Sequence, residues 1–180
     1  MIRRHKLPYL TLAAAVAIVD QVTKWLAESR LLEHRPVEII PGLLNLTLVR
    51  NTGVAFGLFP SGGSILGTAL LIGVGLLALG VVGLYFKRTP NEERLLLTGL
   101  GLVLGGAVGN LADRILSSAV TDFIDFYWGS YHFHTFNIAD SAITVGVVLL
   151  ILDMLLERRR GPVEGSLEET LEETLEETAG

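Results

Sequence analysis

The polar residues best suited to chemistry lie where the last apolar segment of the chain begins. A helix that starts near Phe136 would carry four polar residues on one face of an otherwise apolar rod. They are Asn137, Asp140, Ser141 and Thr144, at i, i+3, i+4 and i+7. A carboxylate on such a face is costly in lipid and is tolerated where it faces protein or a wet cavity. Asp140 is therefore predicted to belong to a functional site.

A second carboxylate precedes this segment, in the stretch Thr121-Asp122-Phe123-Ile124-Asp125-Phe126. Asp122 and Asp140 each lie at the mouth of an apolar segment, and the connector between them is long enough to fold back. Two acids that share a proton can activate a water molecule and polarise a carbonyl, because proximity separates their pKa values. Asp122 and Asp140 are predicted to form this pair, with Asp125 as the competing partner from the same turn.

The composition indicates whether these acids lie in a soluble or a membrane protein. Half of the 180 residues are hydrophobic, and the charges lie at the ends and in short connectors. Ile65 to Phe86 contains no charged residue and exceeds the roughly 20 residues needed to cross hydrocarbon. The pattern predicts an integral membrane protein. The chain has no cysteine, which excludes a disulfide framework, a thiol nucleophile and a cysteine-based metal site.

The predicted fold class is an all-α membrane protein with four transmembrane helices and a small extracytoplasmic β element. The spans are expected at about residues 7–26, 64–86, 95–115 and 136–156. The first is read as a retained helix and not a signal peptide, because it lacks a small-residue cleavage pattern. Alternating apolar residues on either side of Pro41-Gly42 predict a two-stranded element at the membrane surface, within about residues 31–62.

Basic residues predict the orientation of the four spans. They gather at the N-terminus, in the 87–94 connector and after the fourth span, whereas the 117–135 connector has none. The positive-inside rule then places both termini in the cytoplasm. Asp20, Asn110 and Asp113, with the acids already named, converge on the outer third of the membrane. The active site is accordingly expected near the extracytoplasmic face.

Other polar residues on the helices allow a structural interpretation. Asp20 and Lys24 have the i, i+4 spacing of a local ion pair, with Lys24 extending toward the membrane interface. Asn110, Asp113 and Arg114 share one helical face and form either a buried structural network or part of the site. A separate stripe of Gly101, Gly105 and Gly109 predicts a close helix contact. His132 and His134 show no metal-ligand spacing that combines with helical carboxylates, so no metal site is predicted.

Five blocks of sequence, in order, resemble the lipoprotein signal peptidase family, also called signal peptidase II. They are Asp20-Gln21-Val22-Thr23-Lys24, Arg50-Asn51-Thr52-Gly53-Val54-Ala55-Phe56-Gly57, Gly105-Gly106-Ala107-Val108-Gly109-Asn110-Leu111-Ala112-Asp113-Arg114, Val120-Thr121-Asp122-Phe123-Ile124-Asp125 and Phe136-Asn137-Ile138-Ala139-Asp140. The resemblance covers roughly residues 7–156. The family usually has Val-Val-Asp where this chain has Val-Thr-Asp, a conservative difference.

The resemblance implies an intramembrane aspartic endopeptidase that removes the signal peptide of a diacylglyceryl-modified prolipoprotein, cutting just before the lipidated cysteine. It implies a catalytic pair of Asp122 and Asp140. The polar positions around the substrate would be Asn51, Asn110, Arg114 and Asn137. The supporting positions would be Asp20, Lys24 and Asp113. The family's extracytoplasmic strands and short surface helix would correspond to residues 31–62.

The same resemblance sets the expected partners and location. The partners would be lipidated prolipoproteins and membrane lipid, with no nucleic acid, no metal and no organic cofactor, and the protein would act as a monomer. It would lie in the cell (inner, cytoplasmic) membrane as a multi-pass protein. A peptidase domain would occupy residues 1–160.

Two other functions fit a small membrane protein with buried acids. A proton-coupled transporter would use intramembrane carboxylates as a relay, with acids spread through the membrane depth or in two related halves. Neither pattern is visible, since Asp153 is the only clear acid on the inner side. A non-enzymatic assembly protein is the third possibility. Loss of cleavage on a change at Asp140 that leaves folding intact would distinguish the enzyme from both.

Residues 161–180 differ in composition from the rest of the chain. Leu-Glu-Glu-Thr occurs three times, and the segment has no basic residue. Glutamates at i, i+4 repel one another, and the leucine stripe is too thin to bury a core. A disordered acidic tail is expected, with a partner-binding helix as the alternative.

Overall fold

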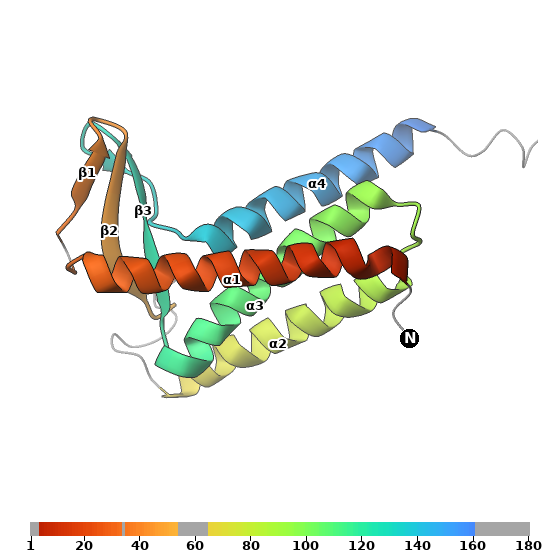
Figure 1. Ribbon diagram of the computed structural model, residues 1–180, viewed down its shortest axis with the longest axis horizontal. Helices are drawn as coiled ribbons and strands as arrows, with labels where there is room; N and C mark the ends of the chain where they lie inside the picture. The colour runs from red at the N-terminus through yellow and green to blue at the C-terminus, as the bar shows by residue number, and fades with distance from the viewer. Residues whose placement is uncertain (1–3, 34, 54–64, 161–180) are drawn as a thin grey trace, which may run out of the picture.

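The computed structural model of the protein describes residues 4–33, 35–53 and 65–160. Four long helices lie side by side, and a small antiparallel sheet covers one end of them (Figure 1). The helices are α1 (Leu7–Arg30), α2 (Ile65–Arg88), α3 (Arg94–Ser117) and α4 (Ile138–Arg160), and a short 3-10 turn, η1 (Arg4–Lys6), precedes α1. The predicted tail, and residues 34 and 54–62 of the range predicted for the β element and the surface helix, lie outside the described residues.

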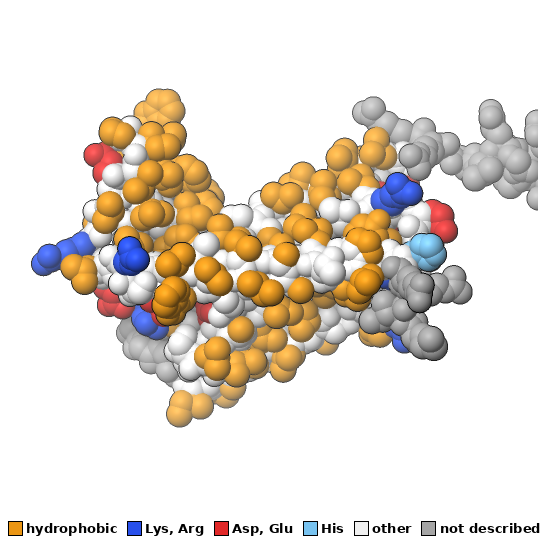
Figure 2. Space-filling model, viewed as in Figure 1, with side chains coloured by type: hydrophobic (Ala, Val, Ile, Leu, Met, Phe, Trp, Pro, Cys, Tyr) orange, Lys and Arg blue, Asp and Glu red, His pale blue; other side chains and the backbone are white. Residues whose placement is uncertain are grey.

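All four helices are long and apolar enough to cross a membrane, judged by length and composition. The predicted fold class is confirmed. Large apolar side chains cover the outside of the bundle, among them Ile65, Leu66 and Leu77. On the face drawn in Figure 2, charged side chains gather at the two ends of the molecule and apolar ones cover the helices between them. This distribution matches the depth profile of a bilayer, with hydrocarbon around the middle and polar headgroups at both ends.

Helix α3 is the centre of the bundle, because it packs against each of the other three. Its predicted glycine stripe faces α1. A Cβ added at Gly101 would lie 3.0 Å from the carbonyl oxygen of Tyr9, and one at Gly105 would lie 2.8 Å from the Cβ of Val16. The close contact predicted from the small residues is confirmed, since no larger side chain fits between these backbones.

A second set of glycines, which the sequence did not single out, brings α3 against α4. A Cβ at Gly99 would lie 3.0 Å from the carbonyl oxygen of Gly146, and one at Gly106 would collide with the carbonyl oxygen of Ala139. The contact at Ala139 is in the first turn of α4. The absence of a side chain at Gly106 therefore determines how closely the polar start of α4 approaches α3.

The sheet has the strand order β1-β2-β3-β4. Its strands are β1 (Val37–Ile40), β2 (Leu44–Asn51), β3 (Val120–Trp128) and β4 (Tyr131–His132). The predicted hairpin is confirmed as β1 and β2, and Gly42 turns it with a φ of 77°. The left-handed backbone conformation suits glycine, which lacks the Cβ that would clash.

Strands β3 and β4 lie in a stretch that the sequence treated only as a connector, and they extend the predicted hairpin to a sheet of four strands. Val120–Trp128 is rich in β-branched and aromatic residues, which favours a strand. Its first four residues are all buried, however, so the alternation of a half-buried strand is missing. The strand is recognisable only once its partner β2 and the helices beneath it are in place.

The middle of β3 is hydrogen-bonded to the segment just before α4. The backbone N–H groups of Phe123 and Ile124 both donate to the carbonyl oxygen of Phe136, at 3.0 and 2.9 Å, and Phe136 donates back to Ile124. This bridge places Phe136, the residue before Asn137, beside the middle of β3. The two segments that carry Asp122 and Asp140 are thereby held together, as the length of the connector allowed.

A first prediction concerns the close approach of α3 and α4. Gly106→Ala inserts a methyl group into the contact with Ala139, whereas the matched change Gly80→Ala places it in open space on α2. We expect Gly106→Ala to destabilise the protein by about 1–3 kcal/mol, the usual cost of overpacking. Gly80→Ala should leave thermal stability in detergent unchanged or slightly raised. A Gly106→Ala melting temperature equal to that of Gly80→Ala would contradict the close packing.

Candidate active site

Asp122 is the third residue of β3 and faces the helices. It pairs across the sheet with Val49 of β2, and only 2% of its surface is exposed. A buried carboxylate requires hydrogen-bond donors, because otherwise its desolvation is uncompensated. Asn51, at the end of β2, donates its side-chain amide to Oδ2 of Asp122 at 3.0 Å. The neighbouring strand thus supplies one of the donors that hold Asp122.

Asp140 lies in the first turn of α4 and takes part in a reciprocal cap with Asn137. The backbone N–H of Asp140 donates to Oδ1 of Asn137 at 2.9 Å, and the backbone N–H of Asn137 donates to Oδ2 of Asp140 at 3.3 Å. A side chain before the helix and another three residues later satisfy each other's backbone donors, as in a capping box. The helix start therefore orients the Asp140 carboxylate.

Asn137 also joins Asp140 to Asp122. Its side-chain Nδ2 donates to Oδ1 of Asp122 at 2.7 Å and to the carbonyl oxygen of Thr121 at 3.3 Å. Asn137 is fully buried, so its amide has few other hydrogen-bond partners. One asparagine thus contacts both carboxylates, and the structure brings the predicted pair into one site.

Asn110 of α3 completes the set of donors. Its Nδ2 donates to Oδ1 of Asp140 at 2.7 Å, and its Oδ1 accepts from Asn137 at 3.3 Å. Each carboxylate of the pair consequently has a donor on both of its oxygens. Three asparagines, from β2, α3 and the start of α4, supply these donors: Asn51, Asn110 and Asn137. Their predicted contact with substrate stays a prediction, while their contact with the acids is direct.

Burial and neighbouring charge set the protonation of Asp122. The pKa of its carboxyl is raised from the usual 3.8 to about 6. Burial is the main cause of this rise, and the negative charge of Asp140 contributes a smaller part of it. The hydrogen bonds from Asn51 and Asn137 oppose the shift because they favour the charged form. Asp122 is therefore neutral below a pH of about 6, so its protonated form is accessible close to neutrality.

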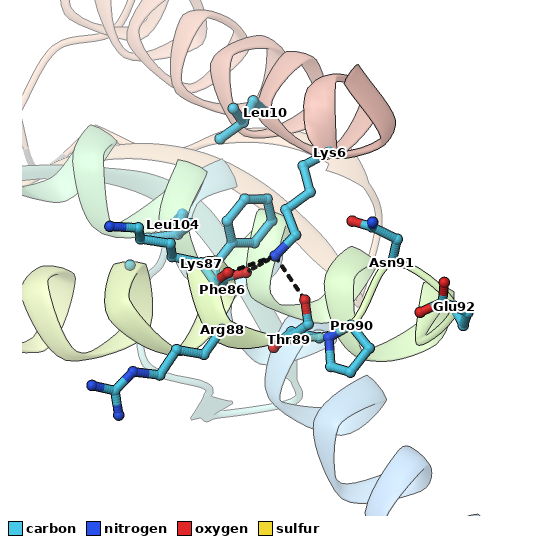
Figure 3. A pocket seen from close by; sticks show the side chains of 11 residues that line it. Lys6, Leu10, Phe86, Lys87, Arg88, Thr89, Pro90, Asn91, Glu92 and Leu104 are labelled. Carbon is cyan, nitrogen blue, oxygen red and sulfur yellow. Dashed lines mark hydrogen bonds between the residues drawn. The ribbon is translucent and has the colours of Figure 1, made fainter. Parts of the chain in front are cut away.

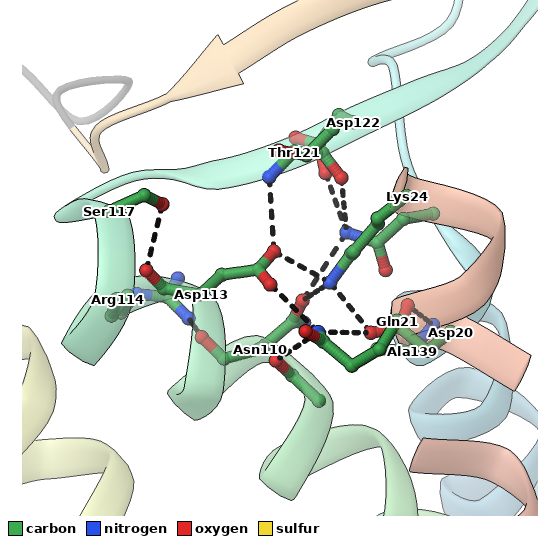
Figure 4. A network of polar contacts seen from close by, with 12 residues as sticks. Asp20, Gln21, Lys24, Asn110, Asp113, Arg114, Ser117, Thr121, Asp122 and Ala139 are labelled. Carbon is green, nitrogen blue, oxygen red and sulfur yellow. Dashed lines mark hydrogen bonds and ion pairs between the residues drawn. The ribbon is translucent and has the colours of Figure 1, made fainter. Parts of the chain in front are cut away.

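A buried ammonium group lies in the network of polar contacts that reaches Asp122 (Figure 4). Lys24 of α1 is 3% exposed, and its Nζ lies 2.8 Å from Asp20 Oδ2 and 2.9 Å from Asp113 Oδ2. It also donates to Oδ1 of Asn110 at 3.0 Å. The predicted pair of Asp20 and Lys24 is confirmed. The expectation that Lys24 extends to the membrane interface was wrong, because a second acid, from α3, draws the ammonium inward.

Each of the two acids around Lys24 also accepts a hydrogen bond from the backbone of an element that carries Asp122 or Asp140. Oδ1 of Asp20 accepts the backbone N–H of Ala139 at 2.8 Å, which caps the start of α4. Oδ2 of Asp113 accepts the backbone N–H of Thr121 at 3.2 Å, next to Asp122. Both predicted supporting acids therefore connect α1 and α3 to backbone groups that adjoin Asp140 and Asp122. A carboxylate is also favourable at a helix N-terminus, where the dipole is positive.

Gln21 is a member of this network to which the sequence assigned no role. Its Nε2 donates to Asp113 Oδ1 at 2.8 Å, to the carbonyl oxygen of Gly109 at 3.2 Å and to Asp20 Oδ2 at 3.3 Å. It thereby bridges the two acids that hold the ammonium. Its place between Asp20 and Lys24 in the first of the five sequence blocks was the only available signal.

Asp125 and Arg114 have partners outside the pair. Asp125 accepts from Asn45 at 3.2 Å and lies 2.9 Å from Nδ1 of His132. Asp125 is the rival that the sequence left open, and these contacts place it with sheet residues and not with Asp140. Arg114 donates to the carbonyl oxygen of Asn110 at 3.0 Å, one turn back on α3. Its predicted contact with substrate stays a prediction.

A cavity of about 310 Å³ opens beside Asp122. It is lined by Val49 to Asn51 at the end of β2, by Thr52, and by His134 and Thr135 of the segment that leads to α4. Asn51 lines the cavity and also bonds to Asp122, so the carboxyl can be reached from this side. Two acids, one able to hold a proton and one able to accept one, can here activate a water molecule and protonate a carbonyl oxygen.

Comparison with known proteins gives a consistent result. The family model described as Signal peptidase (SPase) II matches residues 12–156. A lipoprotein signal peptidase of Symbiobacterium thermophilum is 47% identical over 152 residues, which cover 84% of this chain and 97% of the relative. A lipoprotein signal peptidase of Coxiella burnetii is 46% identical over 155 residues, which cover 83% of this chain and 90% of the relative.

Solved structures agree with this relationship. A bacterial membrane enzyme determined by the in meso method at 2.3 Å resolution superposes with a TM-score of 0.76 and 31% identity, covering 87% of this chain and 92% of that one. Another, determined at 1.9 Å resolution by the same method, superposes with a TM-score of 0.74 and 34% identity, covering 82% and 92%. The similarity therefore extends to the arrangement of the helices and the sheet.

The protonation of Asp122 gives a second prediction. Infrared titration of the protonated carboxyl, assigned by its loss in Asp122→Asn, should report a pKa of about 6. Asp140→Asn should lower this pKa, because it removes the neighbouring negative charge that disfavours ionisation. The value should still lie above 3.8, since burial is the larger cause. An Asp122 pKa that does not move in Asp140→Asn would mean that the two carboxyls do not interact.

The buried ammonium gives a third prediction. Lys24→Met should destabilise the protein by about 3–5 kcal/mol, because it leaves the charges of Asp20 and Asp113 buried without a cation. The matched change Lys87→Met removes an exposed ammonium from the other end of the bundle and should have little effect. Thermal unfolding in detergent compares the two. Equal melting temperatures for both variants would show that the network around Lys24 is unimportant for stability.

Proposed function

Because the chain belongs to the signal peptidase II family, we propose that Asp122 and Asp140 are the catalytic residues with which it removes signal peptides from prolipoproteins. The protein is an aspartic endopeptidase of the membrane. The observation that carries the residue assignment is the position of Asn137, whose side chain and backbone bond to the two carboxylates at once. The proposed cleavage site lies just before the diacylglyceryl-modified cysteine.

The environments of the two acids assign their roles. Asp122 is the acid, because burial raises its pKa to about 6 and keeps its protonated form available. Asp140 is the base, because the positive end of the α4 dipole stabilises negative charge in the first turn. Asn110 donates to Asp140 without supplying a proton, so the carboxylate remains able to accept one. The two carboxyl groups of the pair thus share a single proton.

The proposed reaction follows from these roles. Asp140 takes a proton from a water molecule, whose oxygen attacks the carbonyl carbon of the scissile bond, while Asp122 gives its proton to the carbonyl oxygen. The tetrahedral intermediate then collapses. The proton on Asp140 passes to the leaving amine, the C–N bond breaks, and Asp122 recovers its proton from the intermediate's hydroxyl. The pair ends the cycle with the single proton it began with.

The proposed location is the cell (inner) membrane, with both termini in the cytoplasm and the active site near the extracytoplasmic face. Three basic residues, Lys87 and Arg88 at the end of α2 and Arg94 at the start of α3, lie at the end of the bundle opposite the pair. The positive-inside rule favours the cytoplasm for that end. A signal peptide that spans the membrane as a helix would then present its C-terminal end at the level of Asp122 and Asp140.

Substrate contacts are proposed for the residues nearest the accessible side of the pair. Asn51 lines the 310 Å³ cavity, and Arg114 lies on α3 one turn beyond Asn110. A planar guanidinium suits peptide carbonyl groups, to which it can donate twice. Membrane lipid surrounds the apolar helices in this proposal, and the protein acts as a monomer, since all of the proposed catalytic groups come from one chain.

The catalytic pair gives a fourth prediction, tested with purified protein and a lipidated prolipoprotein. Asp122→Asn and Asp140→Asn should each lower turnover by about 10⁴-fold or more, because the two acids act as a unit. Asp125→Asn is the matched control. It changes another buried aspartate of β3, bonded to Asn45 and His132, and should keep substantial activity. Product size and the new N-terminus report cleavage.

Near-normal turnover in either pair variant would contradict the assignment. Thermal unfolding of each variant, measured in the same detergent, separates a loss of chemistry from a loss of folding. Loss of activity in Asp125→Asn alone, with both pair variants active, would instead identify Asp125 as the acid.

A further inference from the structure

A cavity of about 940 Å³ opens at the end of the bundle opposite the catalytic pair. Figure 3 shows the residues that line it. The ends of α1 and α2 and the connector to α3 surround it, and Leu104 of α3 contributes to its wall. The cavity extends along the bundle from the charged helix ends toward the apolar middle. This position corresponds to the boundary between headgroups and hydrocarbon, whichever way the protein is oriented.

The inner part of the cavity is apolar and open. Leu10, Gly83 and Leu104 line it, one residue from each of α1, α2 and α3. A Cβ added at Gly83 would meet nothing within 4 Å, so the glycine leaves a groove on the surface of α2. An acyl chain fits the chemistry of such a groove, because it is flexible and apolar.

The outer part of the cavity carries an excess of positive charge. Lys6 is buried, and its Nζ donates to the carbonyl oxygens of Phe86, Lys87 and Thr89 at 2.7, 2.8 and 2.7 Å. These acceptors are neutral, and none of the ion pairs in the described part of the chain includes Lys6. The ammonium therefore caps the C-terminal end of α2, and no carboxylate of the described residues neutralises it.

Two further cations line the same cavity against one acid. Lys87 and Arg88 are exposed at the end of α2, and Glu92 is the acid among the lining residues. The local charge thus favours an anion. A phosphodiester at the headgroup level meets this requirement, and each basic side chain near anionic lipid adds to the attraction.

Asn91 supplies a polar atom that the protein itself does not use. Its Oδ1 is buried and has no hydrogen-bond partner among the described residues, and Asn91 lines the cavity. A buried acceptor without a donor is uncommon in folded proteins. A small rotation of the side chain would offer this oxygen to a hydroxyl group bound in the cavity.

We propose that this cavity binds an anionic phospholipid with a hydroxylated headgroup, of the phosphatidylglycerol type. One acyl chain lies in the groove along Gly83 and Leu104, the phosphate lies against Lys87 and Arg88, and a headgroup hydroxyl donates to Asn91. The bound lipid is separate from the substrate's own diacylglyceryl group, since the two sites lie at opposite ends of the helices. It would tie α1 to α2, which both pack against α3.

Native mass spectrometry of the full chain in detergent, with equal amounts of phosphatidylglycerol and phosphatidylcholine, tests the proposal. Phosphatidylglycerol should bind about 10-fold more strongly, because two additional cations each contribute several-fold. Gly83→Leu fills the groove and should abolish this preference, whereas the matched Gly80→Leu points into open space outside the cavity and should retain it. Asn91→Leu should weaken phosphatidylglycerol binding several-fold.

The double variant Lys87→Gln/Arg88→Gln keeps the result decisive if Gly83→Leu folds poorly. It changes only exposed side chains and should reduce phosphatidylglycerol binding by about 10-fold. Asp140→Asn should bind the lipid like the unchanged protein, which separates this site from the substrate site. Equal binding of the two lipids, or an unchanged preference in the double variant, would overturn the proposal.

Discussion

The rest of the site depends on the buried ammonium of Lys24 and the three side chains that bind it. It is buried between Asp20 and Asp113 and donates to Asn110, and each of these three partners makes a second bond to an element that carries the catalytic pair. Asp20 holds the first turn of α4, Asp113 holds the start of β3, and Asn110 holds Asp140 itself. One cation from α1 thereby fixes the relative position of two helices and a strand.

Such a buried cluster contributes more to geometry than to net stability. Taking an ammonium and two carboxylates out of water is expensive, and their attraction only offsets that expense when hydrogen bonds satisfy the remaining atoms. Here Gln21 and two backbone N–H groups provide those bonds. The glycines of α3 make the arrangement possible, because they allow both α1 and α4 to approach α3 closely. The polar groups of three helices then meet at one depth.

Several of these features could be predicted from the sequence, for identifiable reasons. Helix existence followed from long uncharged segments, and the pairing of Asp20 with Lys24 followed from i, i+4 spacing. The inward direction of Lys24 could not be predicted, because it depends on Asp113 of a distant helix. Strand β3 was missed because burial on both faces removes its alternation. The dual role of Asn137 was also missed, although the spacing of Asn137 and Asp140 is that of a reciprocal helix cap.

The central claim is that Asp122 and Asp140 work as a pair that shares one proton. The pH dependence of kcat/KM for a lipidated prolipoprotein tests it most directly, because it reports the ionisations of the free enzyme. A shared proton predicts a bell-shaped profile, with activity lost at low pH when both acids are protonated and lost at high pH when the proton is gone. The two limbs belong to the pair as a whole, and the alkaline limb is expected near the raised pKa of about 6, where the shared proton leaves. Activity that rises with pH and stays high under alkaline conditions would contradict the claim.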